Sequence, residues 1–191
     1  MENEVKDAFL GGQLLVAMPS IGDGRFAQSV IFLWSHDAEG AMGLIVNKPI
    51  TGLRLSDIVS QVGVDALDPA RDMDVHTGGP VDKQRGFLLH SADYQGKDTQ
   101  EAEHGAFALT ATIDALKDVA TGQGPAHALL ALGYAGWGAG QLEQELQENA
   151  WLIAPATPDL VFRTEKAQLW ETALATLGVD PRLLSATGGQ A

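Results

Sequence analysis

Four glycines, Gly133, Gly136, Gly138 and Gly140, lie between an apolar run at residues 128–132 and a helical pattern. Strand, glycine-rich turn and helix in this order could cradle a phosphate, because glycines let backbone N–H groups approach an anion at a helix N-terminus. The spacing is GxGxG rather than GxGxxG, however, and no Gly-Lys-Ser/Thr ending follows. Glutamates in the first turns of the helix would also repel a phosphate. We therefore expect these glycines to be structural.

Histidine and serine side chains could supply metal ligands, a base or a nucleophile. The chain has no cysteine, which excludes thiolate nucleophiles and cysteine metal sites. No HExxH, HxH or GxSxG pattern occurs, and a nucleophile–base pair is defined by geometry rather than by sequence order. We predict no metal, no cofactor and no catalytic residue. The five histidines are His36, His76, His90, His104 and His127.

Polar residues stand where four expected strands stop: His36, Asn47, Thr77 and His90. Strand ends are where side chains leave the core and can converge on one surface. We predict that at least two of them share a ligand- or partner-binding surface with Trp137 or the adjoining glycines. In the competing interpretation, each residue caps its own turn by local hydrogen bonds.

Carboxylates on the helix after the glycines offer paired acids for acid–base work. We interpret Glu143, Glu145 and Glu148 as a solvated helix surface instead.

The elements that must position these residues lack the regular strand–helix alternation of a parallel sheet. Hairpin patterns at residues 29–47 and 86–110 predict antiparallel pairing. We expect one mixed α/β domain with a curved, barrel-like, mostly antiparallel sheet and about four flanking helices. Residues 160–162 are expected to be extended. The residues assigned to structural turns are Gly79, Pro80, Gly136, Gly138 and Gly140.

The chain ends carry no sign of targeting to a membrane. The N-terminal segment holds more acid than base and no long apolar run, so we predict neither a signal peptide nor a membrane span, and a cytoplasmic protein. The domain is expected to cover residues 1–184, with a disordered tail at residues 185–191.

The charge balance argues against direct binding of nucleic acid. The 12 basic residues face 25 acidic ones, which gives a net charge of −13. The basic residues are scattered, and Lys83 and Arg85 are the closest pair. Proteins that bind a phosphate backbone normally present a basic patch. Direct DNA binding is therefore disfavoured.

Three separated stretches resemble the YqgE/AlgH family of bacterial proteins: Phe9 to Pro49, Gly78 to Ser91 and Leu132 to Leu152, with a weaker match at Leu169 to Pro181. The resemblance implies a single mixed α/β domain with a bent, barrel-like sheet. It implies no agreed biochemical activity and carries over no catalytic residues. Some members are labelled transcriptional regulators, a label that would transfer by analogy alone.

Two classes of function remain open. The first is a non-enzymatic regulatory or interaction protein with an unknown protein partner, which the lack of a catalytic motif favours. The second is a small-molecule binder or hydrolase-like enzyme with a pocket near Gly79-Pro80 and the turn at residues 136–140.

Overall fold

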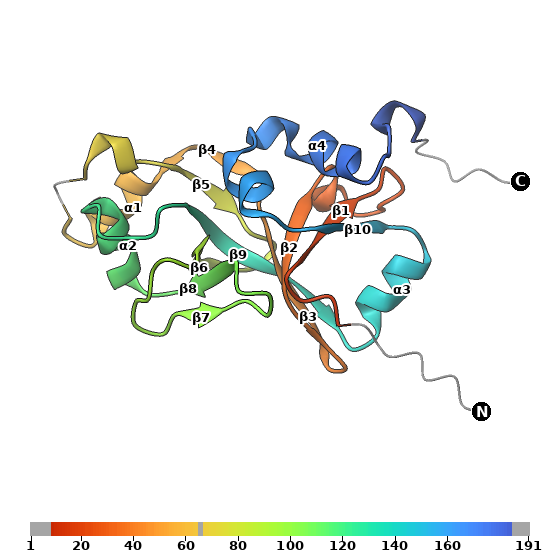
Figure 1. The fold of residues 1–191 in the computed structure, drawn as a ribbon, viewed down its shortest axis with the longest axis horizontal. Helices are drawn as coiled ribbons and strands as arrows, with labels where there is room; N and C mark the ends of the chain where they lie inside the picture. Colours follow the sequence, from red (N-terminus) through yellow and green to blue (C-terminus); the bar gives the residue numbers. More distant parts are fainter. Residues whose placement is uncertain (1–8, 65–66, 185–191) are drawn as a thin grey trace, which may run out of the picture.

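The computed structural model describes residues 9–64 and 67–184. The tail predicted at residues 185–191 lies outside these ranges. Within them, ten strands form one curled sheet and four α-helices cover it (Figure 1). The strands are β1 (Gln13–Ala17), β2 (Val30–Asp37), β3 (Gly40–Ile45), β4 (Pro49–Arg54), β5 (Asp74–Thr77), β6 (Val81–Ser91), β7 (Gln100–Glu101), β8 (Phe107–Thr110), β9 (Ala128–Gly138) and β10 (Trp151–Pro155). The helices are α1 (Leu55–Gln61), α2 (Ile113–Ala120), α3 (Gln141–Gln147) and α4 (Leu169–Thr176).

The sheet runs in the order β10-β1-β2-β3-β9-β6-β8-β7, and β4 and β5 form a branch beside β9. In the described chain the β5–β9 pair is parallel, and the other strand pairs are antiparallel. The predicted curved, mostly antiparallel sheet with about four helices is confirmed.

Strand β9 crosses the centre of the molecule and joins its two halves (Figure 1). Residues 128–132 pair with β5 and β6, whereas residues 135–138 pair with β3. Gly133 lies between these stretches with φ of 74°, and a Cβ there would lie 2.6 Å from the Gly79 carbonyl oxygen. A residue without a Cβ is needed because L side chains rarely adopt this backbone conformation.

Each half of the sheet packs against its own helices. Alternation along β2 places Phe32 against the side that Trp170 of α4 covers, and Ile31 against the side that Leu142 of α3 covers. A third cluster, which includes Val119 of α2, fills the space between α1, α2 and the sheet. Within the described ranges, no helix is long and apolar enough to cross a membrane.

Two local predictions are wrong. Gly136 and Gly138 lie within β9 rather than in a turn, and neither has a positive φ; Gly140, just before α3, does have one, at 74°. Residues 160–162 are not extended but belong to the helical segment Asp159–Arg163. The Thr157 hydroxyl accepts a hydrogen bond from the Leu160 backbone N–H at 3.2 Å, which begins this segment as an N-cap would.

Candidate functional site

An open cavity of about 570 Å³ lies where the second half of β9 meets α3, β10 and the loop before β2. A neighbouring hollow of about 240 Å³ shares Arg25, Phe26 and Pro80 with it. We call the two together the central groove. The aromatic residues Phe26, Trp137 and Trp151 are among those that line it. The groove lies beside the Gly79-Pro80 turn, where the sequence analysis placed a possible pocket.

The Glu145 carboxylate organises the larger part of the groove. Its Oε2 accepts hydrogen bonds from the indole Nε1 atoms of Trp137 at 2.9 Å and Trp151 at 2.7 Å. Its Oε1 accepts from the Gln141 side-chain amide at 3.2 Å, one helical turn away. The two indole rings meet edge to face with centroids 6.0 Å apart. One carboxylate therefore holds two indole rings that come from different strands, β9 and β10.

Replacing Glu145 with leucine is expected to lower the free energy of unfolding by about 1–3 kcal/mol for each buried indole N–H left without an acceptor. Trp137 and Trp151 are 7% and 2% exposed, so water does not replace the lost acceptor freely. Urea denaturation followed by tryptophan fluorescence would measure the change. Glu148→Leu, at an exposed position of the same helix end, is the matched control and should stay within about 0.5 kcal/mol of wild type. Equal effects of the two changes would contradict the anchoring role.

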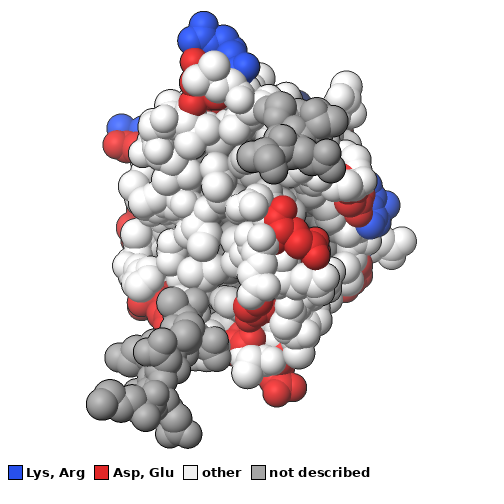
Figure 2. All heavy atoms as spheres, turned by 90° about the vertical axis from the view of Figure 1, so that its right-hand side faces the viewer, with Lys and Arg blue, Asp and Glu red and all other residues white. Residues whose placement is uncertain are grey.

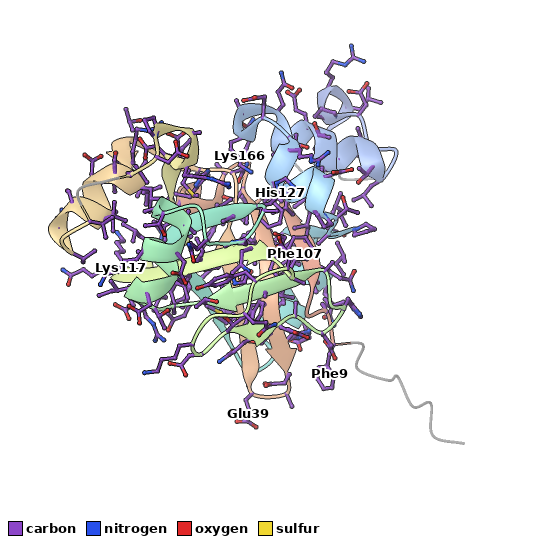
Figure 3. All side chains as sticks on the ribbon, turned by 60° about the vertical axis from the view of Figure 1, so that its left-hand side comes forward. Phe9, Glu39, Phe107, Lys117, His127 and Lys166 are labelled. Carbon is purple, nitrogen blue, oxygen red and sulfur yellow. The ribbon has the colours of Figure 1, made fainter. Side chains whose placement is uncertain are left out.

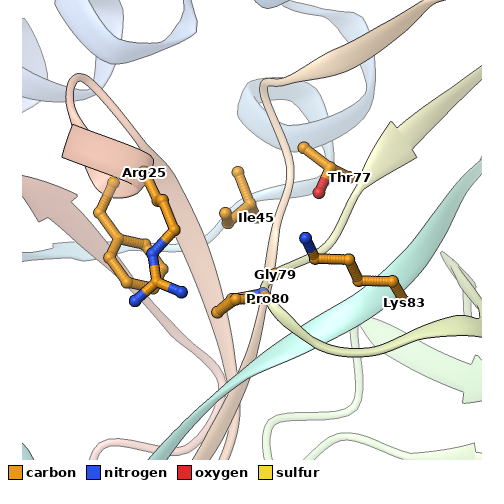
Figure 4. A pocket seen from close by; sticks show the side chains of 7 residues that line it. Arg25, Ile45, Thr77, Gly79, Pro80 and Lys83 are labelled. Atoms are coloured by element: carbon orange, nitrogen blue, oxygen red, sulfur yellow. The ribbon is translucent and has the colours of Figure 1, made fainter. Parts of the chain in front are cut away.

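The smaller part of the groove is basic at its rim. In Figure 4 the side chains of Arg25 and Lys83 lie on opposite sides, with Gly79 and Pro80 between them. Arg25 Nη2 lies 2.6 Å from Asp23 Oδ2, and hydrogen bonds from this guanidinium lower the pKa of the Asp23 carboxyl. The charge of Arg25 is thus balanced within the loop.

The structure brings some of the residues predicted for a binding site together. Thr77, Gly79 and Pro80 line the smaller part of the groove, and Gly136 and Trp137 line the larger part. Whether they bind a ligand or partner stays a prediction.

His36, Asn47 and His90 lie elsewhere and bind other segments. His36 Nδ1 accepts from the Leu10 N–H at 3.2 Å, and its Nε2 lies 2.8 Å from Glu143 Oε1. Asn47 accepts from the Val30 N–H at 2.9 Å and donates to the Gln28 carbonyl at 2.9 Å.

The third residue of this group, His90, is fully buried between the Ser91 carbonyl and the Thr110 hydroxyl. Its Nδ1 lies 2.8 Å from the Ser91 carbonyl oxygen and its Nε2 lies 2.9 Å from the Thr110 hydroxyl. Burial lowers the pKa of His90, although the Ser91 carbonyl acts in the opposite direction. Like His36 and Asn47, it is held by partners of its own. Of the four strand-end residues Thr77 alone lines the groove, so the predicted convergence of at least two of them there is not seen.

The sequence analysis missed Glu145, Trp151, Phe26 and Arg25. The interpretation of Glu145 as solvated surface is wrong, because two indoles and an amide hold its carboxylate against the groove. The spacing of four residues between Gln141 and Glu145 predicts that these two side chains meet on one face of the helix. The tryptophans that complete the cluster come from β9 and β10, and no helical spacing predicts their approach. In the part of the chain that the structure describes, no three histidine or acidic side chains converge as metal ligands would.

Comparisons with known proteins cover nearly the whole chain. A family model described as AlgH-like matches residues 14–182. A UPF0301 protein of Rhodospirillum rubrum is 48% identical over 185 residues, which covers 97% of this chain and 96% of the relative. A UPF0301 protein of Ruegeria pomeroyi is 51% identical over 183 residues, with 95% and 99% covered.

Two solved structures share the fold. The solution structure of the AlgH protein from Pseudomonas aeruginosa matches with a TM-score of 0.77 and 42% identity, and the match covers 100% of both chains. A crystal structure from Corynebacterium diphtheriae matches with a TM-score of 0.70 over 86% of this chain and 85% of that chain. At 20% identity, the second match speaks for the fold alone.

Proposed function

The chain belongs to the AlgH-like family, and we propose that it is a non-enzymatic interaction protein whose central groove binds a segment of a protein partner. The observation that carries the proposal is the groove itself, which combines three aromatic rings with carboxylates in an open, preformed cavity. Phe26 is the half-buried ring of the three and offers a partner apolar surface, and aromatic residues are enriched where proteins bind one another.

The charges of the larger part of the groove favour a basic, apolar peptide segment as the occupant. Glu145 and Glu148 line the larger part of the groove, and aromatic faces beside carboxylates attract lysine and arginine side chains. Figure 2 shows the end of the molecule that carries α3 and β10, where acidic atoms outnumber basic ones. The net charge of −13 would steer a basic partner toward this protein and oppose the approach of a nucleic-acid backbone.

The contacts within the groove support binding rather than catalysis. Glu145 already accepts three hydrogen bonds, Asp23 is paired with Arg25, and Glu148 accepts a hydrogen bond from the Gln144 amide. Among the described residues that line the groove there is no histidine. A general base needs a carboxylate or imidazole that can take up a substrate proton. A regulatory role for the protein would follow from the identity of the bound partner.

The test is selection of binders from a random peptide library, followed by affinity measurements on groove variants. Selected peptides should combine lysine or arginine with apolar residues. Phe26→Ser and Glu148→Lys should each weaken binding by at least about tenfold, the loss expected for about 1.4 kcal/mol of contact energy. Ile113→Ser and Glu39→Lys are matched controls at exposed positions outside the groove and should leave the affinity unchanged.

Two results would overturn the proposal. One is peptide binding that survives both groove changes. The other is that no peptide is selected, while a metabolite raises the melting temperature of wild type but not that of Phe26→Ser. This second result would identify a small-molecule site instead.

A further inference from the structure

A second and smaller pocket lies between the start of α4 and the connection from β3 to β4. Its volume is about 180 Å³, and Lys48, Lys166 and Trp170 are among the residues that line it. Figure 3 shows Lys166 where the C-terminal helical segments approach the sheet. This space suits a small group rather than a polypeptide segment.

The two lysines of this pocket lack carboxylate partners. Lys48 Nζ donates to the Arg25 carbonyl oxygen at 2.9 Å, and Lys166 Nζ donates to the Val161 carbonyl oxygen. No ion pair to either lysine forms within residues 9–64 and 67–184. An ammonium group has three donors, so each lysine uses one donor and keeps two for another acceptor.

Both ammonium groups are partly withdrawn from water. Burial lowers the pKa of Lys48 and lowers that of Lys166 to about 8. The charge of Glu165 acts on Lys166 in the opposite direction, although the two residues form no ion pair. Desolvation of a cation without an opposite charge is unfavourable. A chain with 25 acidic residues could readily supply a carboxylate, yet Glu171 at the pocket stays exposed and makes no ion pair with either lysine.

A third nitrogen-bearing side chain, that of His76, is close enough to Lys166 for the charge of the lysine to lower its pKa. His76 on β5 pairs with Pro49, next to Lys48 in the chain, and is 4% exposed. The backbone of Asp74 and Leu130 lies near the ring, but neither ring nitrogen has a partner with hydrogen-bond geometry. Buried polar atoms are normally satisfied. His76 is an exception, and its pKa is lowered first by burial and second by the charge of Lys166.

We propose that this pocket binds a small oxyanion, a phosphate or carboxylate group, between the ammonium groups of Lys48 and Lys166. The anion would pair with both ammonium groups and accept their unused N–H donors. Asn47 and Gln28 also line the pocket. The site is separate from the central groove, so this proposal does not depend on the proposed peptide binding.

The test titrates full-length protein at neutral pH with sodium phosphate and, separately, with sodium malonate, each at an ionic strength held constant with sodium chloride. Saturable heat of binding by calorimetry, with a rise in melting temperature, is expected for at least one of the two. A response to phosphate alone identifies a tetrahedral anion, and a response to malonate alone identifies a carboxylate. Lys48→Gln and Lys166→Gln should each weaken binding by about tenfold or more, as loss of a charge-assisted contact does.

Lys97→Gln is the matched control, because it removes the same charge at an exposed position outside the pocket and should bind like wild type. Circular dichroism checks that the variants are folded, and Lys48→Gln, at the more exposed lysine, keeps the test valid if Lys166→Gln does not fold. The proposal is overturned if wild type shows no saturable binding of either anion, or if folded Lys48→Gln binds as tightly as Lys97→Gln.

Discussion

Alanine in place of Gly79 is expected to leave little folded protein. A Cβ at this position would lie 2.1 Å from the Tyr134 carbonyl carbon and 2.2 Å from its oxygen. These are backbone atoms of the central strand β9, so a side-chain rotation cannot relieve the clash. The φ of Gly79 is 156°, which L residues rarely adopt. We expect a loss of about 4–5 kcal/mol or more, a large share of the stability of a typical domain.

The control for this prediction is Gly138→Ala. Gly138 has no positive φ, and a Cβ there would meet no atom of the described chain within 4 Å. We expect the free energy of unfolding of this variant to stay within about 0.5 kcal/mol of wild type. Urea denaturation followed by circular dichroism would measure both variants. Similar losses in the two would mean that the close approach of the Gly79 turn to β9 does not limit stability.

This pair of glycines shows where sequence reasoning succeeds and where it stops. A cluster of glycines after an apolar run predicts special backbone geometry, and Gly133 and Gly140 have it. The turn predicted at Gly136 and Gly138 does not form, because β9 continues to Gly138 by pairing with β3. That pairing partner lies far away in the sequence, and so does the strand that crowds Gly79. Local pattern cannot reveal either.

The same limit applies to the groove. Hairpin patterns and the family resemblance predicted the curved antiparallel sheet, and the turn at Gly79-Pro80 was recognised as a place for a pocket. Glu145 was assigned to solvent because a glutamate on an amphipathic helix is usually solvated. Its actual surroundings depend on Trp137 and Trp151, which both donate hydrogen bonds to its carboxylate. The two tryptophans lie close together only because β9 and β10 belong to the same folded sheet.

Stability is expected to fall as the pH is lowered from about 6.5 to about 4, and the buried histidine of β5 is expected to cause part of that fall. Burial first, and the charge of Lys166 second, lower the pKa of His76 from 6.5 to about 4. Above pH 6.5 the ring is neutral in both the folded and the unfolded chain. Between these two pKa values the unfolded chain binds a proton at His76 and the folded chain does not, so unfolding becomes more favourable as the pH falls.

His76→Leu removes this proton uptake. A shift from 6.5 to about 4 corresponds to a loss of up to about 3 kcal/mol across the window. The variant should therefore become more stable relative to wild type as the pH falls from about 7.5 to about 4.5. Urea denaturation at several pH values measures this difference, in which the titration of carboxylates common to both proteins largely cancels. His104→Leu, at an exposed histidine, should show a much smaller change. The prediction is contradicted if the difference in stability between wild type and His76→Leu stays constant over this pH range. The ring of His76 would then take up its proton as readily in the folded chain as in the unfolded one, because it is hydrogen-bonded or hydrated in solution.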